Sequence, residues 1–153
     1  MKYSYRNISG SEAETLLPGF NNENDSRYLD IATVSKCRIA NTYSANITVD
    51  VYLERDIDYD VVQPADDSGQ FYSVETSTFY FIKSLVIPTG AAIDIFDGNP
   101  CAYERKFKLK IKLNGSSETA DIVLGYSIDK NYNTAYSAER TRQVSSQGNL
   151  RQY

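Results

Sequence analysis

The sequence predicts an all-β protein, built as an antiparallel β-sandwich or a jelly-roll-like fold. Between Phe107 and Leu113 apolar residues alternate with lysines, which is the period of a strand with one buried face and one exposed face. At least six segments with strand character follow one another, separated by turn residues. Helical periodicity is scarce. Short strands punctuated in this way are typical of sandwiches and jelly rolls.

The first 30 residues are polar and irregular, and we expect them to form an N-terminal arm outside the sandwich. Within this arm, residues 11–17 have the pattern of one or two helical turns. Ser11 and Glu14 have the spacing of a capping box, and Pro18 would end the helix.

The sandwich domain is predicted to span residues 31–128 and to begin with two strands, 31–40 and 46–54. The second alternates cleanly, with one face made of Ile47, Val49, Val51 and Leu53. The connection at residues 41–44 is rich in turn formers, so we expect the two strands to form a hairpin.

A long polar loop is predicted at residues 55–77, and it is expected to protrude from the domain. Strands follow at 78–87 and 91–96. The segments 105–113 and 119–128 are predicted to form a second hairpin across the turn Asn114-Gly115-Ser116.

Residues 129–153 are poor in apolar side chains and are expected to form an extended C-terminal arm. Four basic and two acidic residues give this arm a charge of +2, which leaves −6 for the remainder of a chain whose net charge is −4. The arm is either a solvated tail or a docking segment. For docking, the candidate interface residues are Tyr132, Tyr136, Arg140, Arg142 and Tyr153.

The composition argues against most catalytic and metal chemistry. Histidine is absent, so the chain contains no Ser-His-Asp arrangement and no imidazole metal ligand. Cys37 and Cys101 are too few for a four-cysteine zinc site, and they are either disulfide-bonded or two reduced thiols. We expect no enzyme activity, no cofactor and no metal.

One acidic cluster, Asp56, Asp58 and Asp60, has carboxylates that would share a face if the segment is extended. It lacks the glycine of an EF-hand loop, because Val61 stands at the sixth position. The cluster either binds a hard cation weakly or forms a solvated strand edge.

The lysine stripe of Lys106, Lys108, Lys110 and Lys112 admits three interpretations. The lysines protect a sheet edge or face against unwanted pairing, dock onto an acidic neighbouring subunit, or contact nucleic acid. The third is the weakest, because no aromatic residues are interleaved with the lysines and the net charge is negative.

Two strand-turn phrases resemble small β-sandwich structural proteins of the virions of tailed bacteriophages, particularly those of marine and cyanobacterial viruses. One phrase is Cys37 to Asn41 followed by Ile47 to Leu53, and the other is Phe81 to Gly90. The resemblance implies a structural role without an active site. The implied partners are other virion proteins and copies of the chain itself.

From this resemblance we expect a component of the neck or tail of a virion that is assembled in the host cytoplasm. We expect no small-molecule substrate, membrane or nucleic-acid partner. Capsid decoration, or a minor capsid role, is the alternative within the same class. A carbohydrate-binding adhesin using Tyr59, Phe71 and Tyr72, and a small hydrolase, are the competing functions.

Overall fold

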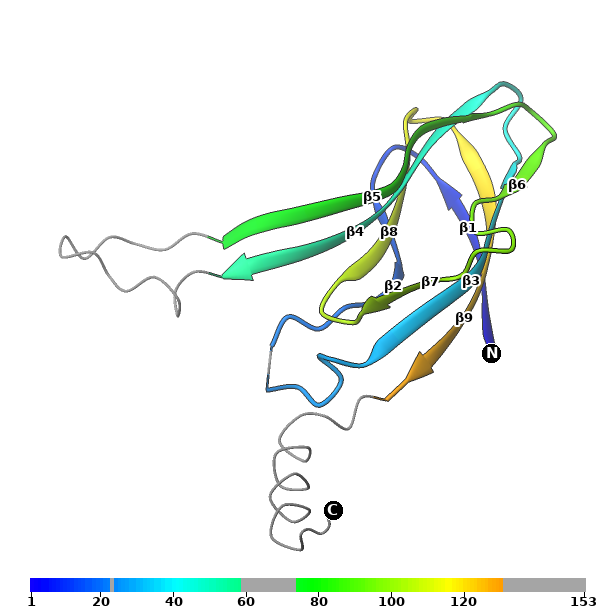
Figure 1. Ribbon diagram of the computed structural model, residues 1–153. Helices are drawn as coiled ribbons and strands as arrows, with labels where there is room; N and C mark the ends of the chain where they lie inside the picture. The colour runs from blue at the N-terminus through cyan, green and yellow to red at the C-terminus, as the bar shows by residue number, and fades with distance from the viewer. Residues whose placement is uncertain (23, 59–73, 131–153) are drawn as a thin grey trace, which may run out of the picture.

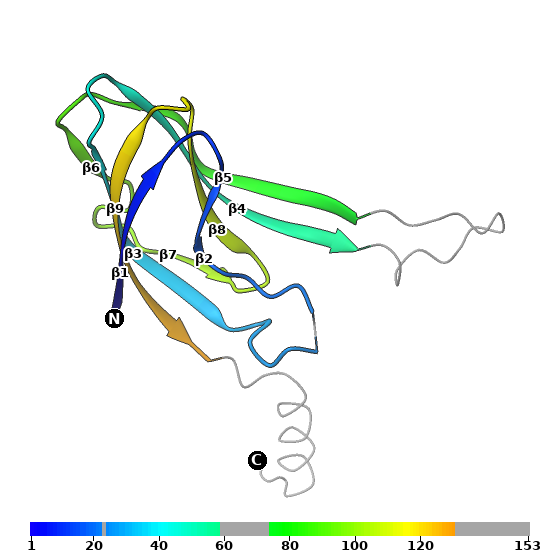
Figure 2. The same cartoon turned by 180° about the vertical axis from the view of Figure 1, so that it is seen from behind.

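The computed structural model describes residues 1–22, 24–58 and 74–130, and within them the chain is entirely β-strand, turn and loop. Two sheets pack face to face (Figure 1), and the view from behind shows the same two layers (Figure 2). The strands are β1 (Lys2–Ser9), β2 (Glu14–Leu17), β3 (Ile31–Asn41), β4 (Ile47–Asp58), β5 (Val74–Ile87), β6 (Ala92–Asp94), β7 (Cys101–Glu104), β8 (Lys108–Leu113) and β9 (Thr119–Asp129).

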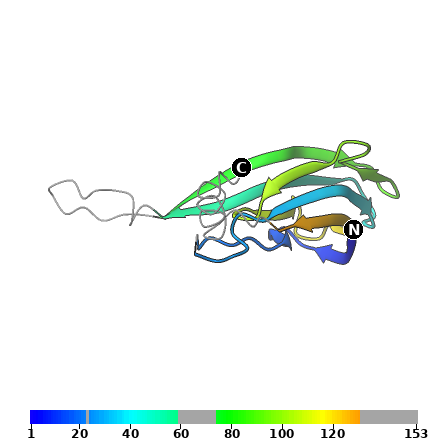
Figure 3. The same ribbon diagram turned by 60° about the horizontal axis from the view of Figure 1, so that its bottom comes forward.

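One sheet has five strands and the other has four, and all pairings are antiparallel. In the five-stranded sheet β9 lies between β1 and β3, while β6 and β7 pair with successive parts of β3. The order of the other sheet is β2-β8-β4-β5. Figure 3 shows the two layers from the end of the sandwich.

The chain crosses between the sheets at almost every connection. Only β4 and β5 follow each other within one sheet, and β6 with β7 fill a single edge position beside β3. Eight strand positions connected in this order form a jelly roll. The predicted fold class is therefore confirmed.

The core lies between the two sheets and consists mainly of aliphatic side chains. Alternate residues of each strand point inward, as the period of a pleated strand requires. The largest side chains with almost no exposed surface are Val34, Ile39, Ile47, Val49, Val51, Ile87, Leu109, Ile111, Leu113, Ile122 and Leu124. The inner faces predicted for 46–54, 107–113 and 119–128 therefore lie in the core.

Both predicted hairpins were wrong. β3 and β4 belong to different sheets, as do β8 and β9, so residues 42–46 and 114–118 carry the chain across the sandwich. The alternation of a strand shows which face is buried but not which strand lies beside it. A short turn can therefore either fold a hairpin or join two layers that share a core.

The N-terminal segment differs most from its prediction. β1 pairs with β9 along its whole length, and β2 pairs with β8, so residues 2–17 belong to the sheets and not to an arm. The predicted helix at 11–17 was wrong because Leu16 and Leu17 are buried in the core, and this tertiary contact outweighs the local capping pattern.

The predicted loop at 55–77 begins and ends as strand. β4 continues to Asp58 and β5 starts at Val74, and beyond Glu54 β4 pairs with β5 alone. This two-stranded ribbon projects from the body of the sandwich (Figure 1). The predicted strand 105–113 begins later than expected, at Lys108, because residues 105–107 form the turn that follows β7.

Asn41 joins two connections at one end of the sandwich, β3–β4 and β5–β6, and it is 4% exposed. Its Nδ2 donates to the carbonyls of Ala45 and Ile87, each at 2.8 Å, and its Oδ1 accepts from the N–H of Tyr43 at 2.8 Å. Its own N–H donates to Ala91. Both the oxygen and the nitrogen of the buried amide are therefore hydrogen-bonded, and these bonds offset the free-energy cost of removing the amide from water.

Replacing Asn41 by alanine should lower the free energy of unfolding by about 3 kcal/mol, because two carbonyls and one N–H lose their partners in a buried site. Urea denaturation measures the loss. The matched control is Asn99→Ala at an exposed turn, where the change should stay within about 0.5 kcal/mol. Equal losses at the two positions would contradict the role assigned to the buried amide.

Candidate interaction surfaces

Large apolar side chains that remain exposed gather at the edges of the sheets. Tyr3 and Tyr5 lie on β1, Phe79, Tyr80 and Val86 lie on β5, and Ile93 lies on β6, with Met1 just ahead of β1. Each of these strands is an edge strand. No such side chain is found on the inner strands β3, β8 and β9, or on β4 as far as Arg55.

The outer face of β5 presents an aromatic group to solvent beside a cation. The rings of Tyr80 and Tyr52 lie 5.3 Å apart, and the Lys83 ammonium lies 4.8 Å from the centre of the Tyr80 ring. Tyr80 is 46% exposed whereas Tyr52 is 7% exposed. Tyr52 thus supports Tyr80 from below, and Tyr80 provides a contact surface with a polar tip.

The predicted lysine stripe is present, and the charge of Lys110 is matched within the sheet. Lys108, Lys110 and Lys112 alternate with buried residues along β8 and face outward. Lys110 donates to Glu54 of β4 at 3.1 Å, and both side chains are only about one-fifth exposed. Because β8 lies between β2 and β4, the lysines do not protect a sheet edge.

Lys106 lies apart from this stripe, in the turn between β7 and β8, where it forms an ion pair with Glu104 at 3.3 Å. The other candidate interface residues, Tyr132, Tyr136, Arg140, Arg142 and Tyr153, lie outside the described residues. The same holds for Tyr59, Phe71 and Tyr72 of the adhesin hypothesis.

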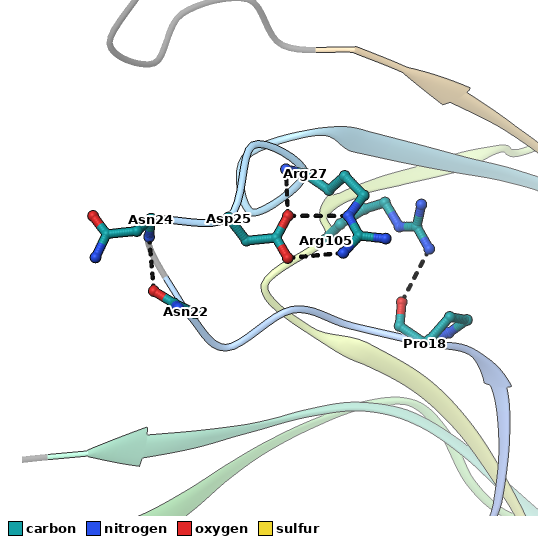
Figure 4. Close-up of polar contacts among 6 residues, drawn as sticks. All are labelled: Pro18, Asn22, Asn24, Asp25, Arg27 and Arg105. Atoms are coloured by element: carbon teal, nitrogen blue, oxygen red, sulfur yellow. Dashed lines mark hydrogen bonds and ion pairs between the residues drawn. The ribbon is translucent and has the colours of Figure 1, made fainter.

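A cluster of arginine and aromatic side chains, which the sequence did not reveal, closes one end of the sandwich. Two guanidinium groups lie against the Phe20 ring, with Arg27 at 4.1 Å and Arg105 at 4.8 Å from its centre. Arg105 also donates to the Pro18 carbonyl at 3.2 Å, and Arg27 is held by Asp25 (Figure 4). Cation–π contacts of this kind join segments that are far apart in the sequence.

The same cluster pins residues 18–30 to the turn between β7 and β8. The Phe20 N–H donates to the Arg105 carbonyl, and the Arg105 N–H donates to the Asp30 carbonyl, each at 2.8 Å. Nearby, Arg55 of β4 donates to the Tyr28 hydroxyl at 2.9 Å. This loop is therefore part of the folded body.

Asp25 and Arg27 form a two-pronged ion pair in this loop. Arg27 donates to both carboxylate oxygens of Asp25, at 3.0 and 2.9 Å, and its N–H also donates to this carboxylate. These hydrogen bonds lower the pKa of Asp25 to about 2. The pair therefore supports the loop at neutral pH, and this support is lost as the pH falls from about 4 towards 2.

The described residues carry neither a metal-binding group of side chains nor a membrane-spanning helix. Among residues 1–22, 24–58 and 74–130, no three His, Cys, Asp or Glu side chains form a group able to hold a metal ion. Asp60 of the acidic cluster lies outside the described residues. No helix in the described part of the chain is long and apolar enough to cross a membrane.

The two cysteines are free thiols. Cys37 is buried on β3. Cys101 on β7 lies opposite Val34, a residue of β3 that precedes Cys37 by three positions. Burial, together with the nearby Asp94 carboxylate, raises the pKa of Cys37 to about 12, and burial also raises the pKa of Cys101. Of the two alternatives for the cysteines, the structure shows the reduced pair.

Comparisons with protein-family models and with curated proteins found no match. The candidate surfaces are the exposed apolar side chains on the edge strands and the cluster around Phe20 at one end of the sandwich.

Gly19 should be intolerant of a side chain. A Cβ at this position would lie 2.5 Å from the carbonyl carbon and oxygen of Phe107, so the loop would have to move away from the turn. We expect Gly19→Ala to cost about 2 kcal/mol or more in the free energy of unfolding. The control is Gly115→Ala, whose Cβ would meet only the flexible Glu118 side chain. Thermal denaturation of both variants checks this, and a larger loss at Gly115 would contradict it.

The two thiols should differ in reactivity. We expect iodoacetamide at pH 8 to alkylate Cys101 at least about tenfold faster than Cys37, because Cys37 is inaccessible and its thiolate is disfavoured. Peptide mass spectrometry after timed labelling measures both rates. In denaturant the two rates should converge, and equal rates in the native protein would show that Cys37 is not buried as described.

Proposed function

We propose that this chain is a non-enzymatic structural component of the virion of a tailed bacteriophage, located in the neck or tail region. Its partners would be other virion proteins and copies of itself. Two arguments support the proposal: the strand-turn phrases that resemble such proteins, and the jelly-roll connectivity, an architecture that viral capsid proteins and lectins use.

The observation that carries the proposal is the position of the exposed apolar side chains. On β5, Phe79 is 56% exposed and Val86 is 54% exposed, and β5 forms one edge of its sheet. Soluble monomers usually place charges or prolines on such edges to prevent association. Apolar side chains at an edge instead favour contact with another subunit.

The ribbon made by the ends of β4 and β5 supports the same role. Where the ribbon leaves the body of the sandwich, Phe79 packs edge-to-face on Phe107, with ring centres 5.7 Å apart. The Arg55 guanidinium lies 5.8 Å from the centre of the same Phe107 ring. The base of the ribbon is thereby fixed to the body by aromatic and cation–π contacts. A projecting strand pair with a rigid base is suited to reach onto a neighbouring subunit.

Capsid decoration would use the same surfaces, and the symmetry of the particle separates it from a neck or tail location. The carbohydrate-binding alternative depends on aromatic residues outside the described part of the chain. It therefore ranks below assembly.

The test is incorporation into virions of the phage that encodes the chain. A phage lacking the gene is complemented with the wild type or with the double variant Tyr80→Ser, Val86→Ser, and purified virions are quantified by mass spectrometry. Because Tyr80 is 46% and Val86 is 54% exposed, the variant should fold but be incorporated at least about tenfold less, as expected when central apolar contacts of an interface are removed.

Thr78→Ala is the matched control, since Thr78 is an exposed polar neighbour on the same strand, and it should be incorporated normally. Removing residues 131–153 tests the predicted C-terminal arm in the same assay, with loss of incorporation expected. Absence of the wild-type chain from virions would overturn the proposed function. Normal incorporation of the double variant would show that β5 is not the contact surface.

A further inference from the structure

We propose that β1 is a docking edge for a second copy of this chain, and that two copies pair antiparallel through β1 so that their five-stranded sheets become one continuous sheet. The inference deepens the proposed structural role, and rests on that role only for its biological purpose. The pairing itself follows from the geometry of the four sheet edges.

Three of the four edges are unsuited to pairing with another strand. β2 has four residues, a register shift between Thr15 and Leu17, and Pro18 directly after it. The edge formed by β6 and β7 consists of three-residue and four-residue pieces. Short strands, bulges and prolines are the devices that block edge-to-edge association.

β5 is long but irregular. Its register with β4 shifts twice between Val49 and Tyr52, and opposite these shifts Ser84 adopts a φ of 60°. The Ser84 N–H turns to the Asp50 carboxylate, to which it donates at 2.7 Å. The bulge is therefore built into the fold, and it interrupts the row of backbone groups along this edge.

β1 has none of these features. It runs for eight residues in unbroken register with β9 and contains no proline. Its outward face carries Tyr3 and Tyr5, which are 53% and 73% exposed. A long, regular edge that also carries exposed aromatic side chains is a template for another strand.

The backbone groups available for pairing can be identified from the ladder. The N–H of Gly10 donates to the Glu118 carbonyl at 3.0 Å, which extends the β1–β9 register by one hydrogen-bonded pair. In an antiparallel ladder such pairs alternate with pairs whose N–H and C=O groups point away. Tyr3, Tyr5 and Asn7 therefore direct their backbone groups to the free edge.

Charge and the extent of pairing together select one register, because centring on Tyr3 or Asn7, which also avoids like charges, would leave more of β1 unpaired. A twofold axis perpendicular to the sheet can be centred on any residue of β1, and like charges directly opposite each other are destabilising. Centring on Ser4 would oppose Lys2 and Arg6, and centring on Arg6 would oppose the two Arg6 side chains. Centring on Tyr5 opposes Lys2 to Ile8, Ser4 to Arg6 and Tyr3 to Asn7, with no like-charge pair.

This register also covers the apolar surface. Tyr5 would face Tyr5 of the second copy, and on its other side Val123 of β9 is its partner in the sheet. Tyr3 lies over Gly125, where a Cβ would be only 3.0 Å from its ring. The aromatic stripes of the two copies would meet across the axis, joined by about six backbone hydrogen bonds in three reciprocal pairs.

The test uses the purified full chain and charges placed on the axis. Sedimentation equilibrium should show a dimer for the wild type, and Tyr5→Lys and Tyr5→Glu should each raise the dissociation constant at least about tenfold, because each variant opposes its own charge. An equimolar mixture of the two variants should restore dimers, since Lys then faces Glu. At a protein concentration low enough for the wild type to be monomeric, their unfolding midpoints should match the wild type, because Tyr5 is exposed.

Asn7→Lys mixed with Asn7→Glu is the matched control, since each faces Tyr3 of the partner, and mixing should bring no mutual rescue. A wild-type chain that stays monomeric at about 500 µM would overturn the pairing. Tyr5 variants that dimerise as tightly as the wild type would also overturn it. So would restored dimers in the mixture of Asn7 variants without restored dimers in the mixture of Tyr5 variants. A monomer that still enters virions would leave the proposed function intact, whereas a dimer absent from virions would overturn only that function.

Discussion

The aliphatic layer between the two sheets is the constraint on which the remaining structure depends. Its members come from both sheets, and those with the least exposed surface include Ile39 on one side and Ile111 on the other. Two sheets that share such a layer must stay about 10 Å apart. The chain can fill both only by crossing repeatedly from one to the other, and every crossing connection then needs an anchor for its backbone groups.

Two different devices provide these anchors at opposite parts of the molecule. At one connection the buried Asn41 amide satisfies the carbonyls of Ala45 and Ile87. At the other, the Arg105 backbone binds both ends of the loop that joins β2 to β3, while its guanidinium covers Phe20. One anchor is polar and buried, and the other is cationic and aromatic. Each replaces the direct strand pairing that a hairpin would have supplied.

A closed core leaves four sheet edges, and the distribution of side chains over them links the fold to assembly. On the inner strand β8 the charge of Lys110 is matched within the sheet by Glu54. Apolar side chains are exposed at the edges, where backbone groups also lack partners within the sheet. The same surfaces that a monomer would have to protect are thus the surfaces through which a structural subunit gains contacts.

Much of the fold, but less of the site, could be predicted from the sequence. The alternation around Leu109 and around Val49 identified strands and their buried faces correctly, whereas the partners of these strands were assigned wrongly. Leu16 was assigned to a helix because its neighbours carry a capping pattern, and only contact with the core shows it to be strand. The cluster around Phe20 left no local signal, because its residues come from separate segments.

The sequence alone determined which side chains face inward in the strands whose alternation is clear, such as β4 and β8, because a period of two is a property of neighbouring residues. Only the tertiary structure decided which strands lie side by side, and hence that β1 remains an open edge. Strand partners are chosen by contacts between residues far apart in the chain, and local alternation carries no information about them.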